Sequence, residues 1–170
     1  MKLLKATLKD CNILQEICKE SYSQNFYSHW IDNGLETFLE KEFNLKKIIS
    51  DLKNRNIKFY FIIYKSEVIG FAKISFNVDF FSLQNVAELD KIYVLPAYKN
   101  LGIGKFAIAE LIKIIKKRSM KKLYLCVLET NISAIRFYEK MGFVFHSKTR
   151  IRAQNIKDEH KGMNVMLKVL

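Results

Sequence analysis

Apolar residues recur at helical spacing in the first third of the chain, and this pattern predicts two helical regions. Asp10 is a candidate N-cap for the first helix, whose apolar stripe runs from Ile13 to Tyr22. The second region carries Leu35 to Phe43, and after Asn44 a further stretch runs from Leu45 to Leu52. These two stretches could be parts of one broken helix.

Short runs of aromatic and branched residues then predict three strands. Phe59 to Tyr64 and Val68 to Phe76 form a hairpin that turns at Lys65-Ser66-Glu67, and Val86 to Val94 is the third strand. Gly70 in the second strand is open to three interpretations, a bulge, a close approach of two backbones or an ordinary strand glycine.

In the second half of the chain, segments with helical spacing of apolar residues alternate with short apolar runs typical of strands. The predicted elements are a helix over Ile103 to Arg118, a strand over Lys122 to Leu128, a helix over Asn131 to Met141 that Gly142 ends, and strands over Val144 to Arg152 and Met163 to Leu170. This order predicts one α/β domain over residues 1–170 with a mixed sheet. The third strand, the helix after it and the next strand form a right-handed βαβ unit.

Composition narrows the class of protein. Hydrophobic residues make up 49% of the 170 residues and charged residues 27%, which is typical of a globular domain. No apolar stretch has the length of a signal peptide or a membrane span, so we expect a cytoplasmic protein without a membrane partner. Cys11, Cys18 and Cys126 lack CxxC pairing and are interpreted as reduced core residues, and no metal site is expected.

The chain is strongly basic, with a formal net charge of +12. Its densest basic stretch runs from Lys113 to Lys122, with lysines on the polar side of a helix whose other side is apolar. We interpret this stretch as a solvated helix face, and we do not expect nucleic acid as a partner.

A glycine pair at the start of the predicted long helix suggests an anion site. In the segment Leu101-Gly102-Ile103-Gly104-Lys105, unpaired amides of the first helical turn would converge on phosphate oxygens. A phosphate loop of the nucleoside-triphosphate type is excluded, because Phe106 follows the lysine in place of a hydroxyl residue.

A dinucleotide-binding fingerprint is the alternative for this segment. Gly102, Gly104 and Ala107 fit G-x-G-x-x-A, and Glu129 closes the next strand, where a ribose-binding acid would lie. That fold requires a run of parallel βαβ units, whereas only one crossover can be drawn here.

Two motifs in the expected order resemble those of the GNAT superfamily of N-acetyltransferases. Lys99 to Gly104 resembles its Q/R-x-x-G-x-G/A loop, with lysine in the first position, and Asn131 to Phe143 resembles its N-x-x-A-x-x-F-Y-x-x-x-G-F helix. The resemblance implies a mostly antiparallel sheet with a splayed central parallel pair flanked by helices. It also implies acetyl-coenzyme A as the acyl donor.

The resemblance further implies where the coenzyme would bind. The backbone of Ile92, Tyr93 and Val94 would pair with the pantetheine arm, and Asn131 would hydrogen-bond the same arm. The pyrophosphate would lie on the loop that Lys99 precedes, which consists of Asn100, Leu101, Gly102, Ile103, Gly104 and Lys105.

Acetyl transfer to an amine needs a base and an acid. An alkylammonium ion has a pKa of about 10.4, so a proton must leave before attack. The resemblance implies Glu88 as the candidate base, because it lies eleven positions before Lys99, where some members of the family keep a glutamate base. By simple alternation Glu88 shares strand parity with Asp90, Ile92 and Val94. Tyr138 is the candidate acid for the departing thiolate, or it orients the thioester. A solvated strand carboxylate and a core tyrosine are the structural alternatives for these two residues.

A narrower likeness is to bacterial PaiA-type polyamine acetyltransferases. It lies in four stretches, Phe38 to Asn44, Phe59 to Tyr64, Glu88 to Val94 and Cys126 to Asn131. It implies a small primary amine as acceptor, with spermidine or spermine preferred. Acidic residues near the predicted cleft would attract such a polycation, namely Glu36, Glu40, Glu42, Glu88, Asp90 and Glu129.

Other functions stay open from the sequence alone. They are a protein or peptide N-acetyltransferase, a nucleic-acid-binding module, a Rossmann-type oxidoreductase and a protein that senses coenzyme A without turnover. The sequence does not set the oligomeric state, and a homodimer is compatible with it.

Overall fold

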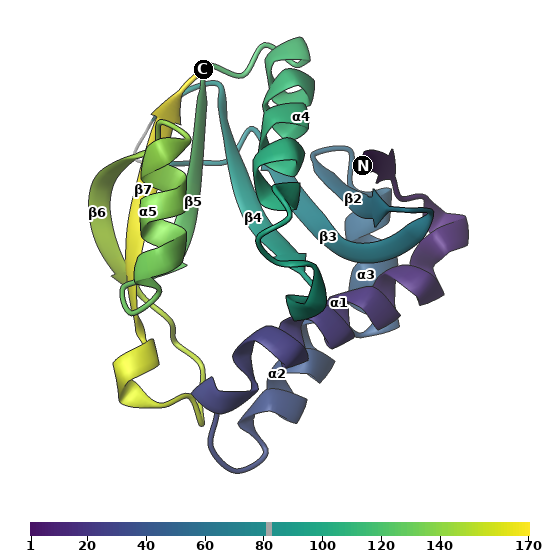
Figure 1. The fold of residues 1–170 in the computed structure, drawn as a ribbon, viewed down its shortest axis with the longest axis vertical. Helices are drawn as coiled ribbons and strands as arrows, with labels where there is room; N and C mark the ends of the chain where they lie inside the picture. Colours follow the sequence, from purple (N-terminus) through teal and green to yellow (C-terminus); the bar gives the residue numbers. More distant parts are fainter. Residues whose placement is uncertain (81–82) are drawn as a thin grey trace.

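The fold is built on one seven-stranded sheet, seen in a computed structural model that describes residues 1–80 and 83–170. The strand order is β1-β2-β3-β4-β5-β7-β6, and β4 and β5 are the parallel pair among otherwise antiparallel neighbours (Figure 1). The strands are β1 (Lys2–Lys5), β2 (Ile57–Tyr64), β3 (Glu67–Phe76), β4 (Val86–Val94), β5 (Lys122–Leu128), β6 (Val144–Arg150) and β7 (Gly162–Val169).

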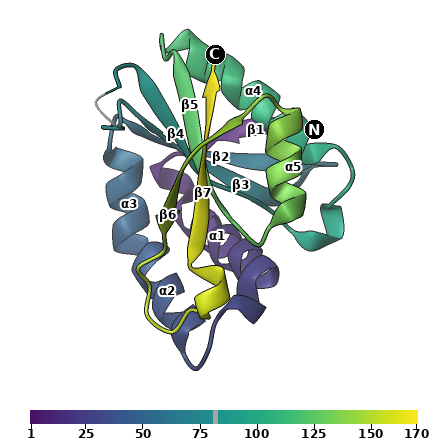
Figure 2. The same cartoon turned by 90° about the vertical axis from the view of Figure 1, so that its left-hand side faces the viewer.

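Helices cover both faces of this sheet (Figures 1 and 2). They are α1 (Cys11–Phe26), α2 (Gly34–Glu42), α3 (Leu45–Lys53), α4 (Ile103–Lys117) and α5 (Ile132–Lys140). The first three pack on one face, where Leu14 and Ile48 meet Phe71 in one core cluster. The last two pack on the other face, where Ile108 and Leu111 of α4 lie in a second cluster. A mixed, mostly antiparallel sheet flanked by helices is therefore confirmed.

The structure adds one strand to the prediction, decides one open alternative and corrects one cap. The sequence pattern gave no sign of β1, a four-residue edge strand that pairs with β2. α2 and α3 are separate helices, because the side chain of Asn44 caps α3 by accepting from the amide of Lys47 at 2.9 Å. Asp10 does not cap α1 with its side chain, since its carboxylate accepts from the amide of Thr7 at 2.8 Å.

Gly70 marks both a bulge and a close approach of two strands. The register between β2 and β3 shifts beside it, between Ile62 and Ile63. A Cβ atom at Gly70 would collide with the carbonyl oxygen of Tyr93 on β4. Two of the three interpretations of this glycine therefore hold together.

β4 contains a bulge that changes which face each side chain occupies. Lys73 of β3 is opposite Lys91, but the next residue of β3 is opposite Leu89, so Asp90 is left without a partner in the register. Glu88 consequently shares the face of Lys91 and Tyr93. The predicted parity of Glu88 with Ile92 and Val94 is wrong, because simple alternation does not continue through a bulge.

The parallel pair separates along its length, as the resemblance implies. β4 and β5 are in register only from Val86 to Glu88 on one strand and from Lys122 to Tyr124 on the other. Beyond these residues the two strands diverge, and the opening between them faces the N-terminus of α4 and the end of α1 (Figure 1). A sheet with one parallel pair does not have the consecutive βαβ units that the Rossmann-type alternative requires.

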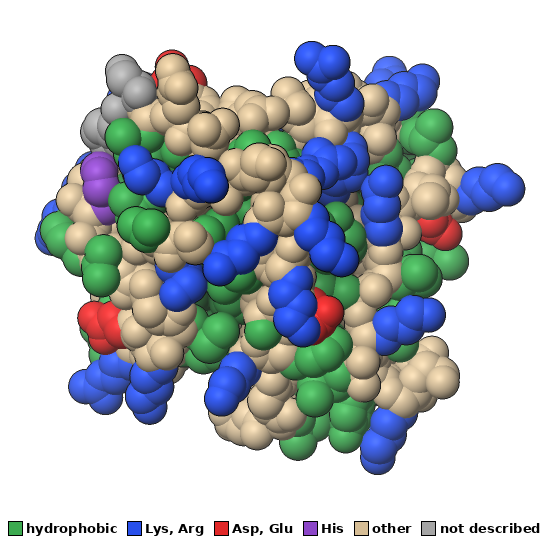
Figure 3. Space-filling view, turned by 90° about the horizontal axis from the view of Figure 1, so that it is seen from above, with side chains coloured by type: hydrophobic (Ala, Val, Ile, Leu, Met, Phe, Trp, Pro, Cys, Tyr) green, Lys and Arg blue, Asp and Glu red, His purple; other side chains and the backbone are tan. Residues whose placement is uncertain are grey.

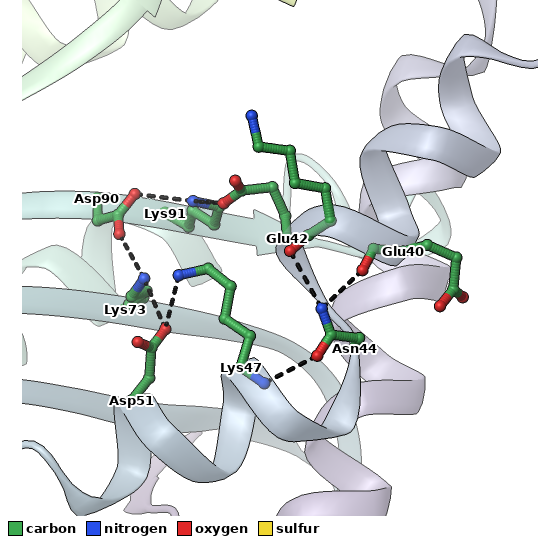
Figure 4. A network of polar contacts seen from close by, with 9 residues as sticks. Glu40, Glu42, Asn44, Lys47, Asp51, Lys73, Asp90 and Lys91 are labelled. Atoms are coloured by element: carbon green, nitrogen blue, oxygen red, sulfur yellow. Dashed lines mark hydrogen bonds and ion pairs between the residues drawn. The ribbon is translucent and has the colours of Figure 1, made fainter.

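A buried network of charges fixes the bulged segment of β4 to the helices on its face (Figure 4). Lys73 of β3 lies 3.0 Å from Asp51 of α3 and 2.9 Å from Asp90. Lys91 lies 2.8 Å from Asp90 and 3.4 Å from Glu42 of α2. The charges alternate in sign, so each buried ion has an opposite partner.

Basic side chains are spread over the end of the molecule where β4 and β5 are still paired (Figure 3). In the predicted basic stretch, Lys116, Lys117 and Arg118 are exposed, whereas Leu111 and Ile115 of the same helix are buried. The predicted solvated helix face is confirmed. Among the residues described, no helix has the length and apolar character to cross a membrane, and no cluster of His, Cys, Asp and Glu could hold a metal ion.

Candidate active site

A cavity of about 350 Å³ occupies the opening between β4 and β5. Its walls come from both strands, from the start of α4, from α5, from the end of α1 and from the segment between β6 and β7. The lining residues are Tyr22, Asn25, Phe26, His29, Ile92, Tyr93, Val94, Lys99, Gly104, Cys126, Val127, Leu128, Asn131, Ser133, Ala134, Phe137, Tyr138, Ile151, Ile156 and Met163.

The β4 wall presents backbone groups to this cavity. The amide of Leu95 bonds to the carbonyl of Ile69 on the β3 side at 2.9 Å, and alternation then directs the backbone of Ile92 and Val94 towards the opening. Asn25 of α1 already donates to the carbonyl of Val94 at 3.0 Å. Tyr93 differs from the expectation, because its backbone groups face β3.

The N-terminus of α4 forms an anion-binding geometry beside the cavity. The first backbone bond of the helix runs from the amide of Phe106 to the carbonyl of Gly102 at 3.1 Å, so the amides of Ile103, Gly104 and Lys105 precede it unpaired within the helix. The positive φ of 75° at Gly102 turns the chain into the helix. Lys99 and Gly104 line the cavity itself.

The other loop residues are placed differently from one another. Asn100, Leu101 and Lys105 are exposed, whereas the side chain of Ile103 is buried in the core. Asn100 has a φ of 64°, so the loop takes the left-handed conformation twice in three residues. Amides that are unpaired within the helix and lie next to a sharp turn are compatible with a phosphate group binding here.

α5 brings two of the predicted residues to the cavity. Asn131 caps this helix, since its side-chain oxygen accepts from the amide of Ala134 and the hydroxyl of Ser133, both at 3.1 Å. Its side-chain NH₂ group has no hydrogen-bond partner among the described residues. Tyr138 packs against Phe143, and burial raises the pKa of its hydroxyl to about 12. The hydroxyl is therefore protonated near neutral pH.

Glu88 lies in a different position from the other predicted site residues. It does not line the cavity, although it is on the face that α1 covers. Burial raises the pKa of its carboxyl group, with a further contribution from the neighbouring Asp90. A hydrogen bond from Tyr124 and the charges of Lys91 and Lys73 act in the opposite direction.

The carboxylates expected to attract a polycation are mostly paired with lysines. Glu40 lies 2.5 Å from Lys19, and Glu129 lies 2.9 Å from Lys148. Glu42 and Asp90 belong to the buried network. No described residue that lines the cavity is a carboxylate. The expected acidic pocket is therefore absent from this cavity, because sequence position alone does not show which charges are already neutralised.

Sequence reasoning missed the wall contributed by α1 and the residues after it. Tyr22 and Phe26 lie with their ring centroids 5.5 Å and 5.2 Å from that of Tyr93, and His29 lies beside them. The spacing of Tyr22 and Phe26 predicts a helical stripe, but periodicity does not tell which strand the stripe faces. His29 follows the last turn of α1 and carries no motif.

Comparisons with known proteins agree with this geometry. The model of the "Acetyltransferase (GNAT) family" matches residues 14–143. A spermidine N(1)-acetyltransferase of Thermoplasma acidophilum is 26% identical over 147 residues, which are 84% of this chain and 88% of that protein. A ribosomal-protein alanine N-acetyltransferase of Haemophilus influenzae is 37% identical over 82 residues, which are 48% of this chain and 51% of that protein.

A solved structure is similar over the whole chain. The PaiA N-acetyltransferase of Thermoplasma acidophilum, crystallised in complex with coenzyme A, superimposes with a TM-score of 0.79 at 24% identity, and the match covers 99% of this chain and 98% of that one. The family match spans the segment from Lys99 to Lys105, both central strands and α5. The chain therefore belongs to the GNAT family of acetyltransferases.

Proposed function

We propose that this acetyltransferase moves an acetyl group from acetyl-coenzyme A to the primary amine of a small molecule, with a polyamine as the preferred acceptor. The observation that carries the proposal is one cavity, lined by Gly104 at the start of α4 and by Tyr138 of α5, between two diverging strands. We propose that it acts as a single domain over residues 1–170, in the cytoplasm.

The coenzyme would bind along the walls of this cavity. The amides of Ile103, Gly104 and Lys105 would take the pyrophosphate, with Asn100, Leu101 and Gly102 forming the turn and Lys99 adding charge. The backbone of Ile92 and Val94 would pair with the pantetheine arm as a neighbouring strand does. The free NH₂ group of Asn131 would donate to the same arm.

Tyr138 and Glu88 would move the protons of the reaction. Tyr138 is protonated near neutral pH and would donate to the departing thiolate, whose conjugate thiol has a pKa of about 8.5. Glu88 would accept a proton from the amine nitrogen through water, since it lies on the sheet face beside the cavity without lining it.

Transfer would be direct, with both substrates bound. Cys126 lines the cavity, but burial raises the pKa of its thiol to about 11, so the thiolate is scarce at neutral pH. A scarce thiolate is a poor nucleophile for forming an acetyl-enzyme. The amine would therefore attack the thioester carbonyl itself.

Two kinds of acceptor have support. The relative named for spermidine matches most of this chain, and the rings of Tyr22, Phe26 and Tyr93 offer a surface on which an ammonium group can bind by cation–π contact. The relative named for the alanine of a ribosomal protein has the higher identity over a shorter stretch. A peptide N-terminus is therefore the second candidate.

A coenzyme A release assay with a panel of amines tests the proposal. The panel contains spermidine, spermine, an alanine-initiated peptide and an aminoglycoside, each with saturating acetyl-coenzyme A. We expect acetylated product and the highest kcat/KM with a polyamine. A higher kcat/KM for the peptide than for the polyamines at every salt concentration would show that the preferred acceptor is a protein N-terminus. Binding of acetyl-coenzyme A without product from any amine would indicate a sensor.

A further inference from the structure

His29 is a titratable residue in the cavity that the proposed function leaves without a role. It lies in the short 3-10 helix after α1 (Tyr27–His29) and lines the cavity together with Phe26 and Tyr93. Neither nitrogen of its imidazole ring has a hydrogen-bond partner among the residues that the structure describes. The ring is therefore available to a ligand in the cavity.

Two segments far apart in the sequence hold His29 in place. Its backbone carbonyl accepts from the amide of Lys157 at 3.0 Å, and Trp30 next to it forms a β-bridge with Ile156. The imidazole stacks on that of His160, with ring centroids 3.8 Å apart and an angle of 21° between the planes. Phe26 packs against its edge at 5.2 Å. These contacts fix the ring without occupying its nitrogens.

The charges around His29 favour its neutral form. Burial lowers the pKa of the imidazole, and His160 and Lys157 lower it further, whereas the carboxylate of Glu159 raises it. Since an ordinary imidazole has a pKa of about 6.5, His29 is neutral at pH 7 and has a free lone pair. His160 faces Thr130, whose hydroxyl lies 3.3 Å from its Nδ1.

We propose that His29 is a catalytic base of this enzyme, which takes the first of the two protons that the acceptor nitrogen must lose. The inference rests on the proposed function. An ammonium group that enters the cavity between the aromatic rings reaches an imidazole with a lone pair, and a free amine results. No described residue that lines the cavity is a carboxylate able to perform this step.

The proton balance then closes without a further reactant. His29 takes one proton from R–NH₃⁺ and becomes imidazolium, and the amine attacks the thioester carbonyl to form the C–N bond. The C–S bond breaks as Tyr138 protonates the sulfur, and the nitrogen loses its second proton to Glu88 through water. Glu88 returns that proton through solvent to Tyr138, and His29 releases its proton to bulk water. The net products are the amide, coenzyme A and one proton.

The test compares pH profiles of kcat/KM for spermidine in the wild type, in His29→Phe and in His160→Phe. Phenylalanine keeps the stacked ring in either position but removes the base only in the first variant. We expect kcat/KM of His29→Phe to be roughly 10²-fold below that of the wild type near pH 7. This difference should shrink as the pH approaches the pKa of the acceptor ammonium group, because more of the amine is then already neutral. His160→Phe keeps the base at position 29 and removes only a neighbour that stacks on it and lowers its pKa, so we expect a much smaller loss than in His29→Phe. We expect the affinity for acetyl-coenzyme A to be unchanged in both variants.

A profile for His29→Phe that superimposes on the wild type would overturn the inference while leaving the proposed function intact. An equal loss in both variants would overturn it too, because a disturbance of the paired rings, and not the loss of a base at position 29, would then explain the effect. His29→Gln serves as a second substitution if the phenylalanine variant does not fold. If the wild type acetylates no amine, the proposed function itself is wrong. The wild-type assay alone shows this, independently of the variants.

Discussion

Single residues in the cavity differ in the protonation state that their surroundings impose. Burial keeps Tyr138 and Cys126 protonated near neutral pH, and it keeps His29 neutral. Outside the cavity lining, the same desolvation raises the pKa of Glu88 above its ordinary value. One physical cause, desolvation, thus sets the protonation states on which the proposed roles of Tyr138, His29 and Glu88 depend.

The substitution Tyr138→Phe removes only a hydroxyl group from the cavity. We expect kcat to fall by roughly 10²-fold, as for loss of a general acid, while the Kd for acetyl-coenzyme A stays within about two-fold. Steady-state kinetics and a binding titration measure the two quantities, and Tyr64→Phe on β2 is the matched control. Undiminished turnover in Tyr138→Phe would make this tyrosine a core residue.

Glu88→Gln tests the cost of burying a carboxylate on β4. The folded-state pKa of Glu88 is raised above its ordinary value of 4.5, so the unfolded chain ionises first as the pH rises. The buried Glu88 therefore costs the wild type no free energy of unfolding below pH 4.5. The free energy of unfolding falls as the pH rises through the folded-state pKa of this group. We expect Glu88→Gln to be the more stable protein at pH 7, with no such advantage in acid.

Thermal unfolding at several pH values measures this difference, and Glu36→Gln on the exposed side of α2 is the control. If Glu88→Gln is less stable than the wild type at pH 7, the carboxylate is stabilised by its partners more than burial destabilises it. We also expect the pH profile of kcat/KM for Glu88→Gln to lie at higher pH than that of the wild type, because more of the amine is already neutral there.

The site residues that could be predicted from sequence are those in motifs whose chemistry is local. The glycine pair Gly102 and Gly104 predicts a turn into a helix, and Asn131 and Tyr138 belong to one helical motif. His29 lies in the same cavity without any motif, because its position depends on contacts with Lys157 and His160 more than a hundred residues away. Such contacts are set by the packed fold and leave no local pattern.

At the scale of elements, the bulge at Asp90 links the charged network to the opening of the sheet. In-register pairing of β4 with β5 ends at Glu88, and the bulge follows two residues later. A bulge bends its strand, so it coincides with the point where β4 turns away from β5. The opening of the sheet therefore lies next to a feature that hydrophobic alternation does not predict.

Lys73→Met removes the central cation of the network that anchors this bulge. Asp51 and Asp90 would remain buried and lose their shared partner, which lies 3.0 Å and 2.9 Å from them. We expect the free energy of unfolding to fall by about 3–5 kcal/mol, as when one partner of a buried ion pair is removed. Urea unfolding measures it, with the exposed Lys46→Met of α3 as control. A loss no larger than that of the control would show that the network contributes little.

Bulky residues at the start of α4 test the coenzyme site. A Cβ at Gly104 would lie 3.4 Å from the ring of Phe137 without a clash, so Gly104→Val is expected to fold while its side chain blocks the amides. Gly102→Val adds strain, because the φ of 75° disfavours side chains. We expect acetyl-coenzyme A to raise the melting temperature of the wild type and of the control Ala109→Val, but not of these variants. An undiminished shift in Gly104→Val would place the pyrophosphate elsewhere.

For the whole molecule, the order of elements was sufficient to predict a mixed sheet with one crossover. The strand order was not predictable in the same way, because β7 lies between β5 and β6 and β1 pairs at the far edge through short, weakly patterned segments. The net charge of +12 is spread over exposed lysines, many of them at the end opposite the opening. That distribution explains why the charge alone says little about the partner.

A crystal structure of the complex with coenzyme A tests most directly whether the opening between β4 and β5 is the active site. We expect the pantetheine arm between Ile92 and Val94 on one side and Asn131 on the other. We also expect the pyrophosphate on the amides of Ile103 to Lys105, and the sulfur within reach of the Tyr138 hydroxyl. Coenzyme A bound outside this opening, or with its sulfur directed away from Tyr138, would contradict the account.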